Sequence, residues 1–254
     1  MKFAVCLYGQ PRDYKTGHLI VNNFIKNNSE HFFDFFIHCW CDDNVKLNAS
    51  THRYIDPNLL QINNSNKIKS DILDYYKPKS YKFQTPIETF DISSIKQSIM
   101  YKNTSLHGQK NIHNILSQMF SRNKVRDILN DYINTKHTVY DMVITMRLDW
   151  SKNIQFNLND INQEKTYVSS MFWKTQKRFI FPDNFVLSPL NVYLKWFNLF
   201  KNLDKIVNNN ALTDKIKKLG ENFIINPEEL ILVNYLLFND IKDIVFHNSI
   251  GNFY

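Results

Sequence analysis

Three nearly continuous apolar runs, each ended by polar or turn-forming residues, constrain the fold of this chain more than any other feature. They span residues 3–8 (FAVCLY), 32–40 (FFDFFIHCW) and 139–146 (VYDMVITM). Strands that are buried on both faces of a parallel sheet carry such unbroken runs, whereas half-exposed strands alternate. Residues 15–27 predict a helix between the first two runs, so the start of the chain predicts a β-α-β unit with a right-handed crossover.

The rest of the chain alternates further strand and helix patterns. It predicts strands over 80–84 and 166–170, helices over 68–76, 112–133 and 190–207, and a last helix opened by Asn226-Pro227-Glu228-Glu229. Pro227 suits a first helical turn, because the N–H that proline lacks has no intrahelical partner there. Residues 89–109 show no clear pattern. With 254 residues and no linker, low-complexity tract or repeat, the chain predicts one α/β domain with an open, mostly parallel sheet flanked by helices.

Composition narrows the classes of function. The formal charge of +7 favours anionic partners, such as nucleic acid, an anionic membrane or a phosphate-bearing substrate. Lys and Arg are dispersed along the chain, which makes a nucleic-acid-binding protein the weaker interpretation. No apolar stretch approaches the roughly 20 residues that span a bilayer, and the start lacks a signal-peptide core, so we expect a cytoplasmic protein. Peripheral membrane association stays open, and the sequence does not indicate the oligomeric state.

The cysteines and the histidine beside them predict core packing rather than chemistry. Cys6, Cys39 and Cys41 are too few for a disulfide framework. The string His38-Cys39-Trp40-Cys41 resembles half of a zinc site, but structural zinc needs four convergent ligands, and the sequence has no second Cys or His pair. We therefore expect buried cysteines, and we expect His38 to be a core histidine with satisfied hydrogen bonds.

Two polar clusters follow predicted strands directly. Gly9-Gln10-Pro11-Arg12 comes after the first apolar run, and Arg147-Leu148-Asp149 comes after the third. Ligands of open α/β sheets bind outside the carboxyl ends of the strands, so we expect Arg12 and Arg147 to line one crevice. Gly9 permits close backbone approach, and the arginine forks suit a diphosphate. A turn capped by a charged residue and a surface ion pair are the structural alternatives for the two clusters.

These motifs resemble those of a known family. The strings FAVCLYGQPRDY, FDFFIHCW, YDMVITMRLDW and FPDNFVLSP are together similar to bacterial and viral polysaccharide-synthesis proteins of the WavE-like glycosyltransferase type. The resemblance implies a GT-A-like fold, with residues 1–150 as a donor-binding half and residues 151–254 as an acceptor half. It places Asp149 where the metal-binding acid of an Asp-x-Asp motif stands. Arg147 replaces the first acid of that motif, and it can itself neutralise part of a diphosphate charge.

Four more residues are candidates for the chemistry. Arg122, on the predicted helix over 112–133, is a candidate ligand of the donor phosphates. Transfer needs a carboxylate that takes the acceptor proton. The candidates are Asp183, in a Pro-Asp-Asn turn, and then Glu228 and Glu229, at the start of the last helix. The structural alternatives are an ordinary turn residue for Asp183 and, for Glu228 and Glu229, acids at the positive end of a helix.

We therefore predict a nucleotide-sugar glycosyltransferase of the hexosyltransferase type, acting on a glycan or lipid-linked acceptor in polysaccharide biosynthesis. A divalent cation, Mn or Mg, held by Asp149 would neutralise the leaving diphosphate. The alternative is a noncatalytic glycan- or nucleotide-binding module of the same fold. The sequence lacks a Walker loop, a Gly-x-Ser-x-Gly elbow and a dinucleotide fingerprint. The predicted donor-binding residues are Gly9, Gln10, Arg12, Arg122 and Arg147, with Asp149 as metal ligand and Asp183 or Glu228 as catalytic base.

Overall fold

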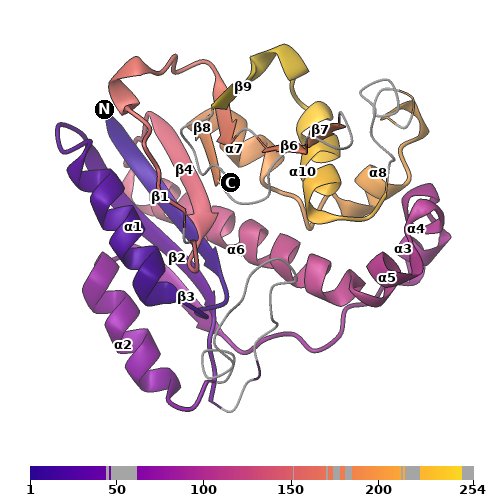
Figure 1. Cartoon of the computed structure of the whole chain (residues 1–254), viewed down its shortest axis with the longest axis horizontal. Helices are drawn as coiled ribbons and strands as arrows, with labels where there is room; N and C mark the ends of the chain where they lie inside the picture. Colours follow the sequence, from indigo (N-terminus) through magenta and orange to yellow (C-terminus); the bar gives the residue numbers. More distant parts are fainter. Residues whose placement is uncertain are drawn as a thin grey trace.

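The computed structural model describes residues 1–43, 46, 62–150, 152–169, 171–173, 178–180, 185–212, 214 and 224–247. Seven strands form one sheet in the order β3-β2-β1-β4-β8-β5-β9 (Figure 1). Its strands are β1 (Lys2–Gly9), β2 (Phe32–Trp40), β3 (Ser80–Gln84), β4 (Met142–Arg147), β5 (Thr166–Ser169), β8 (Phe185–Pro189) and β9 (Ile244–His247). Strands β1 to β4 pair in parallel, as do β5 and β9, whereas β8 runs antiparallel to both β4 and β5. The predicted open, mostly parallel sheet is confirmed.

Helices cover both faces of this sheet (Figure 1). One face carries α1 (Tyr14–Lys26) and α2 (Ser65–Tyr76), and the other carries α6 (Ile112–Lys136), α7 (Leu190–Trp196), α8 (Leu203–Val207) and α10 (Pro227–Leu236). β6 (Met171–Trp173) and β7 (Arg178–Ile180) form a separate antiparallel pair. In the described part of the chain, no helix has the length and apolar character that crossing a membrane requires.

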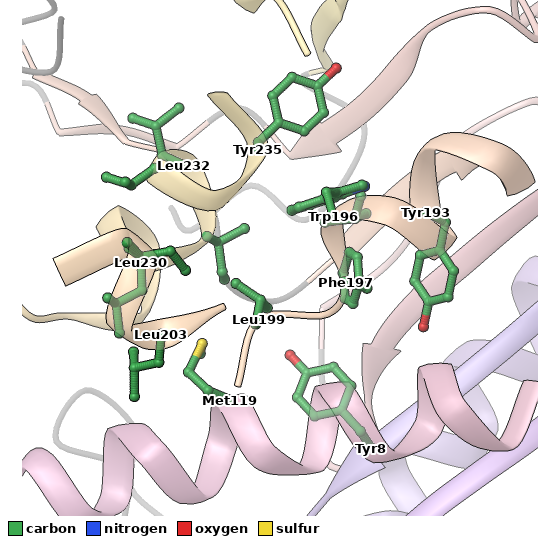
Figure 2. Close-up of a cluster of buried hydrophobic side chains, with 14 of the residues drawn as sticks. Tyr8, Met119, Tyr193, Trp196, Phe197, Leu199, Leu203, Leu230, Leu232 and Tyr235 are labelled. Atoms are coloured by element: carbon green, nitrogen blue, oxygen red, sulfur yellow. The ribbon is translucent and has the colours of Figure 1, made fainter. Parts of the chain in front are cut away.

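The alternation of β1 produces two hydrophobic cores. Phe3, Val5 and Leu7 face α1 and α2, whereas Cys6 and Tyr8 face α6, since successive side chains of a strand point to opposite faces. Both sets are buried, which is why the run is apolar without interruption. Figure 2 shows the core on the α6 side, where side chains from β1, α6, α7 and α10 meet: Tyr8, Met119, Tyr193, Trp196, Phe197, Leu230 and Leu232.

The single helix expected over 190–207 is two helices, α7 and α8. Side chains from other elements bind the carbonyl groups at the end of α7. Arg126 donates from Nε and Nη2 to the Leu194 oxygen, at 3.0 and 2.6 Å, and the Asn234 amide donates to the Trp196 oxygen. These carbonyls are satisfied by side chains, so the helix can end there.

The segment without a clear pattern, 89–109, contains three short helices, α3 (Ser93–Gln97), α4 (Ile99–Asn103) and α5 (Leu106–Lys110). Serines begin two of them. The Ser98 hydroxyl accepts from the N–H of Tyr101, and the Ser105 hydroxyl accepts from the N–H of Gly108. A serine N-cap is a sequence signal, but helices of five residues are too short to show an apolar period.

Helix α1 approaches the end of β4 closely at Gly17. A Cβ placed on Gly17 would lie 2.0 Å from the backbone oxygen of Leu148 and 3.5 Å from the backbone nitrogen of Trp150. The N–H of Leu148 donates to the Tyr8 oxygen at 3.0 Å, which fixes this segment against β1. Gly17 therefore sets the distance between α1 and the Arg147-Leu148-Asp149 segment.

We expect Gly17→Ala to lower the free energy of unfolding by about 1–3 kcal/mol, because a backbone oxygen cannot move as a flexible side chain would. This loss should exceed the gain of about 1 kcal/mol that alanine brings to a helix. Urea unfolding measures it. Lys15→Ala, at an exposed position of the same helix, is the matched control and should stay within about 0.5 kcal/mol. Equal stability of the two variants would contradict the close approach.

Candidate functional site

The carboxyl end of β1 opens the candidate site. Gly9, the last residue of the strand, has a φ of 107°, a left-handed conformation that side chains with a Cβ rarely adopt. Among the described residues, nothing lies within 4 Å of a Cβ built there, so the backbone has open space beside it. The turn then leads through Gln10, which is partly exposed, to Arg12, which is buried.

Arg12 and Arg147 converge on Asp149. Arg147 binds this carboxylate with two parallel bonds, from Nε to Oδ1 and from Nη2 to Oδ2, both 2.8 Å long. The Nη2 atom of Arg12 lies 2.6 Å from the same Oδ2. We call these three side chains the arginine clamp. The expected convergence of the two arginines is confirmed as geometry, although their binding roles stay predictions.

The clamp is not a surface ion pair. The Asp149 side chain is 2% exposed and that of Arg12 is 9% exposed, so both charges have lost most of their water. Removing one partner of such a pair costs about 3–5 kcal/mol, because an uncompensated charge stays buried. The three side chains together carry one net positive charge, at the sheet edge where ligands of open α/β sheets bind.

The contacts of Asp149 do not fit a divalent cation. Both of its carboxylate oxygens accept from guanidinium groups, and a hard cation needs several oxygen ligands that are not already held by cations. The described ranges also contain no group of three or more His, Cys, Asp or Glu side chains that could hold a metal ion. The Mn or Mg role predicted for Asp149 therefore has no support in this geometry.

A hydrogen-bond chain holds Gly9 from the α6 side. The Gly9 N–H donates to the Ser121 hydroxyl at 3.0 Å, and this hydroxyl lies 2.7 Å from Nδ1 of His38. Nε2 of His38 lies 3.5 Å from Oε1 of Gln84. One tautomer satisfies all three contacts: Nε2 carries the proton and faces Gln84, while Nδ1 accepts from Ser121. This chain positions the turn that carries Arg12.

His38 is the core histidine that the sequence predicts. Burial lowers its pKa from 6.5 to about 4, a hydrogen bond to Gln84 opposes that shift, and the nearby Lys82 and Lys124 add to it. The ring packs edge-on against Trp40. His38 is therefore neutral near neutral pH, as the tautomer in the chain requires.

Of the three candidate bases, Glu228 and Glu229 lie among the described residues. Asp183 lies outside the described residues. Asn226 caps α10, since its Oδ1 accepts from the N–H of Glu229 at 2.6 Å, and Oε2 of Glu229 reaches back to accept from the N–H of Ile224 at 2.5 Å. These bonds support the helix-end interpretation for Glu229. Glu228 is partly buried in the same turn. The segment before α10 is tied to the end of α4, because the Ile225 N–H donates to the Thr104 hydroxyl.

Comparison with solved structures finds a similarity to the galactosyltransferase LgtC in complex with donor and acceptor sugar analogs. The two chains are 11% identical, the similarity covers 98% of this chain and 74% of that one, and the TM-score is 0.40. No protein-family model matches the chain, and no curated protein matches it in sequence. A similarity this weak establishes neither a family nor an activity, so the WavE-like resemblance stays a prediction.

Sequence reasoning missed Ser121. It is fully buried on α6 and directly precedes Arg122, which is buried as well. The usable signal is a pair of polar residues in the middle of a long helix, with apolar residues before and after it along the chain. Polar residues at such positions are rarely left without a partner, so they point to a buried polar contact.

We expect Ser121→Ala to lower the free energy of unfolding by about 1–3 kcal/mol, because the Gly9 N–H loses its acceptor. It should also lower the affinity for any ligand that Arg12 binds, since the hydrogen bond from Gly9 to Ser121 no longer fixes the turn that leads to Arg12. Ser117→Ala, on the same helix, is the matched control. Urea unfolding and ligand titration of both variants measure the effect. A change of equal size in the two variants would contradict a positioning role for Ser121.

The lowered pKa of His38 predicts how stability depends on pH. The unfolded state binds a proton on this ring below about pH 6.5, whereas the folded state does so only near pH 4. This contribution is therefore complete above pH 6.5 and is lost as the pH falls, by on the order of 3 kcal/mol at pH 4. Unfolding free energies of the wild type and His38→Asn between about pH 7 and 4 measure it. Identical pH slopes would contradict the buried neutral ring.

Proposed function

We propose that the chain is a nucleotide-sugar-dependent glycosyltransferase that moves a sugar from a nucleoside-diphosphate donor to a hydroxyl group of a glycan or lipid-linked acceptor. One observation carries this proposal. Arg12, which follows β1, and Arg147, the last residue of β4, converge on the buried Asp149 at the edge where ligands of open α/β sheets bind. The motif resemblance to WavE-like glycosyltransferases supports the same class of reaction.

The arginine clamp has the chemistry that a diphosphate needs. Guanidinium groups are planar, always charged and able to bind phosphate oxygens through two parallel hydrogen bonds. Arg147 shows this bidentate mode in its contact with Asp149, and its side chain is 26% exposed, so a ligand can reach it. Asp149 acts as a positioning residue, because it fixes both guanidinium groups before a donor arrives.

The proposed transfer exchanges one bond for another at the anomeric carbon. The bond from this carbon to the diphosphate oxygen breaks, and a bond to the acceptor oxygen forms. The electron pair of the broken bond stays on the diphosphate, where Arg12 and Arg147 stabilise the added charge. The acceptor proton passes to a carboxylate, for which Asp183 and Glu228 remain the proposed candidates.

The proposed cellular location and pathway follow from the sequence analysis. We propose that the enzyme works in the cytoplasm in polysaccharide biosynthesis, with peripheral contact to a membrane if its acceptor is linked to lipid. The diphosphate charge is assigned to the arginines rather than to a metal ion, because the oxygens of Asp149 already bind guanidinium groups. A noncatalytic nucleotide- or glycan-binding module is the second candidate, favoured by the same full engagement of Asp149.

A thermal-shift screen of nucleoside-diphosphate sugars, with and without Mn²⁺, tests donor binding. A ligand at 100 times its Kd should stabilise the native state by about 2.7 kcal/mol. We expect Asp149→Asn to lose most of this shift and to lower turnover about 10²-fold, because the two arginines lose their common partner. Asp160→Asn, at an exposed position, is the control.

The outcomes separate the candidate roles. A donor shift in the wild type without transfer to any acceptor would favour the binding module over the enzyme. An Asp149→Asn variant that keeps its donor affinity and loses only a Mn²⁺ dependence of turnover would restore the metal role of Asp149 and contradict the clamp.

A further inference from the structure

Arg122 is a fully buried cation whose N–H groups have no hydrogen-bond acceptor in the described part of the chain. The side chain has an exposed fraction of 0%. Its Nε, Nη1 and Nη2 atoms make no hydrogen bond with the residues that the structure describes. The guanidinium carbon lies 4.7 Å from the ring centroid of Tyr8 and 6.0 Å from that of Phe197. Figure 2 shows that both rings belong to the core between β1 and α7.

Two aromatic faces do not replace a missing anion. A cation over a ring gains electrostatic attraction, but the N–H groups still need acceptors. Leaving a buried charged group without an acceptor is among the most costly arrangements in a protein interior. One turn along α6, Arg126 shows the usual solution, since its guanidinium donates to the Leu194 oxygen and to Asp127.

The position of Arg122 connects it to the arginine clamp. Tyr8 and Arg147 are register partners in the parallel pair of β1 and β4, so their side chains leave the same face of the sheet. Arg122 packs on the Tyr8 ring from this face. The preceding residue, Ser121, binds the Gly9 N–H, and the space beside Gly9 is open among the described residues. Arg122 therefore lies at the level of the strand ends that carry the clamp.

We propose that Arg122 is a receptor for an oxyanion group of the substrate, which approaches along the open side of Gly9. The group is either a phosphate of the donor or a carboxylate on the transferred sugar, because both offer the oxygen pair that a guanidinium fork binds. This inference rests on the proposed function, and it adds a third cation, which pairs with no carboxylate among the residues that the structure describes.

The proposal makes an unusual prediction for Arg122→Met. A cation that lacks an acceptor destabilises the empty protein, so an apolar side chain of similar length should raise the Tm by about 2–4 °C. The same variant should bind the anion at least about 10-fold more weakly, because the charged hydrogen bonds are lost. Arg122→Lys keeps the charge but loses the fork, and it should bind with intermediate affinity.

Thermal shifts with inorganic pyrophosphate, UDP-glucose and UDP-glucuronate provide the measurement, with Arg126→Met as the matched control. Arg126→Met should lower the Tm, since its bonds to Leu194 and Asp127 are lost, and should keep the ligand shifts. Loss of the pyrophosphate shift in Arg122→Met assigns the site to a donor phosphate. If UDP-glucuronate raises the Tm of the wild type more than UDP-glucose does, and Arg122→Met loses only this difference, the site is assigned to a carboxylate on the sugar.

Two results with the Arg122→Met variant would overturn the proposal on Arg122. One is an Arg122→Met protein that is less stable than the wild type, or does not fold, since either would show that the guanidinium supports the empty fold. The other is an Arg122→Met protein that keeps every ligand shift. The proposed function is judged separately: a pyrophosphate shift that depends on Arg122, with no shift from any nucleotide sugar, keeps the anion site and contradicts the donor. A wild type that none of the probes shifts overturns both.

Discussion

The buried carboxylate of Asp149 is the contact on which the candidate site depends. It joins the turn after β1 to the end of β4, because Arg12 lies in that turn and Arg147 is the last residue of β4. The surrounding fold brings these segments together, since β1 and β4 are adjacent and Gly17 lets α1 lie directly against Leu148. The central strand pair and the arginine clamp are therefore one structural unit.

Helix α6 supports the same edge from the opposite face. Ser121 and Arg122 are consecutive and both buried, yet only Ser121 forms hydrogen bonds with the described residues. Ser121 is satisfied by Gly9 and His38, and such a closed network favours one arrangement of the turn. Arg122 is left without an acceptor among the described residues. The rings of Tyr8 and Phe197 attract this cation but offer its N–H groups no acceptor, which points to a ligand as its partner.

The sequence predicted the features that follow from periodicity and topology. Buried parallel strands have unbroken apolar runs, and the carboxyl ends of parallel strands share one edge of the sheet. The convergence of Arg12 and Arg147 could therefore be predicted from the sequence. The partners of Asp149 could not be predicted, because the spacing of residues does not show whether an acid binds two guanidinium groups or a metal ion. The break after α7 was also hidden, since it depends on Arg126 and Asn234 from distant elements.

The arginines paired with Asp149 and the unpaired Arg122 contribute differently to stability and to binding. Asp149 compensates Arg12 and Arg147 during folding, so their geometry is set before a ligand arrives and little ordering is left for the binding step. Arg122 has no such carboxylate among the described residues, so its desolvation cost persists in the empty protein and an anion can relieve it. Natural proteins keep such local costs chiefly at functional sites. The unsatisfied cation therefore points to a ligand more specifically than the satisfied clamp does.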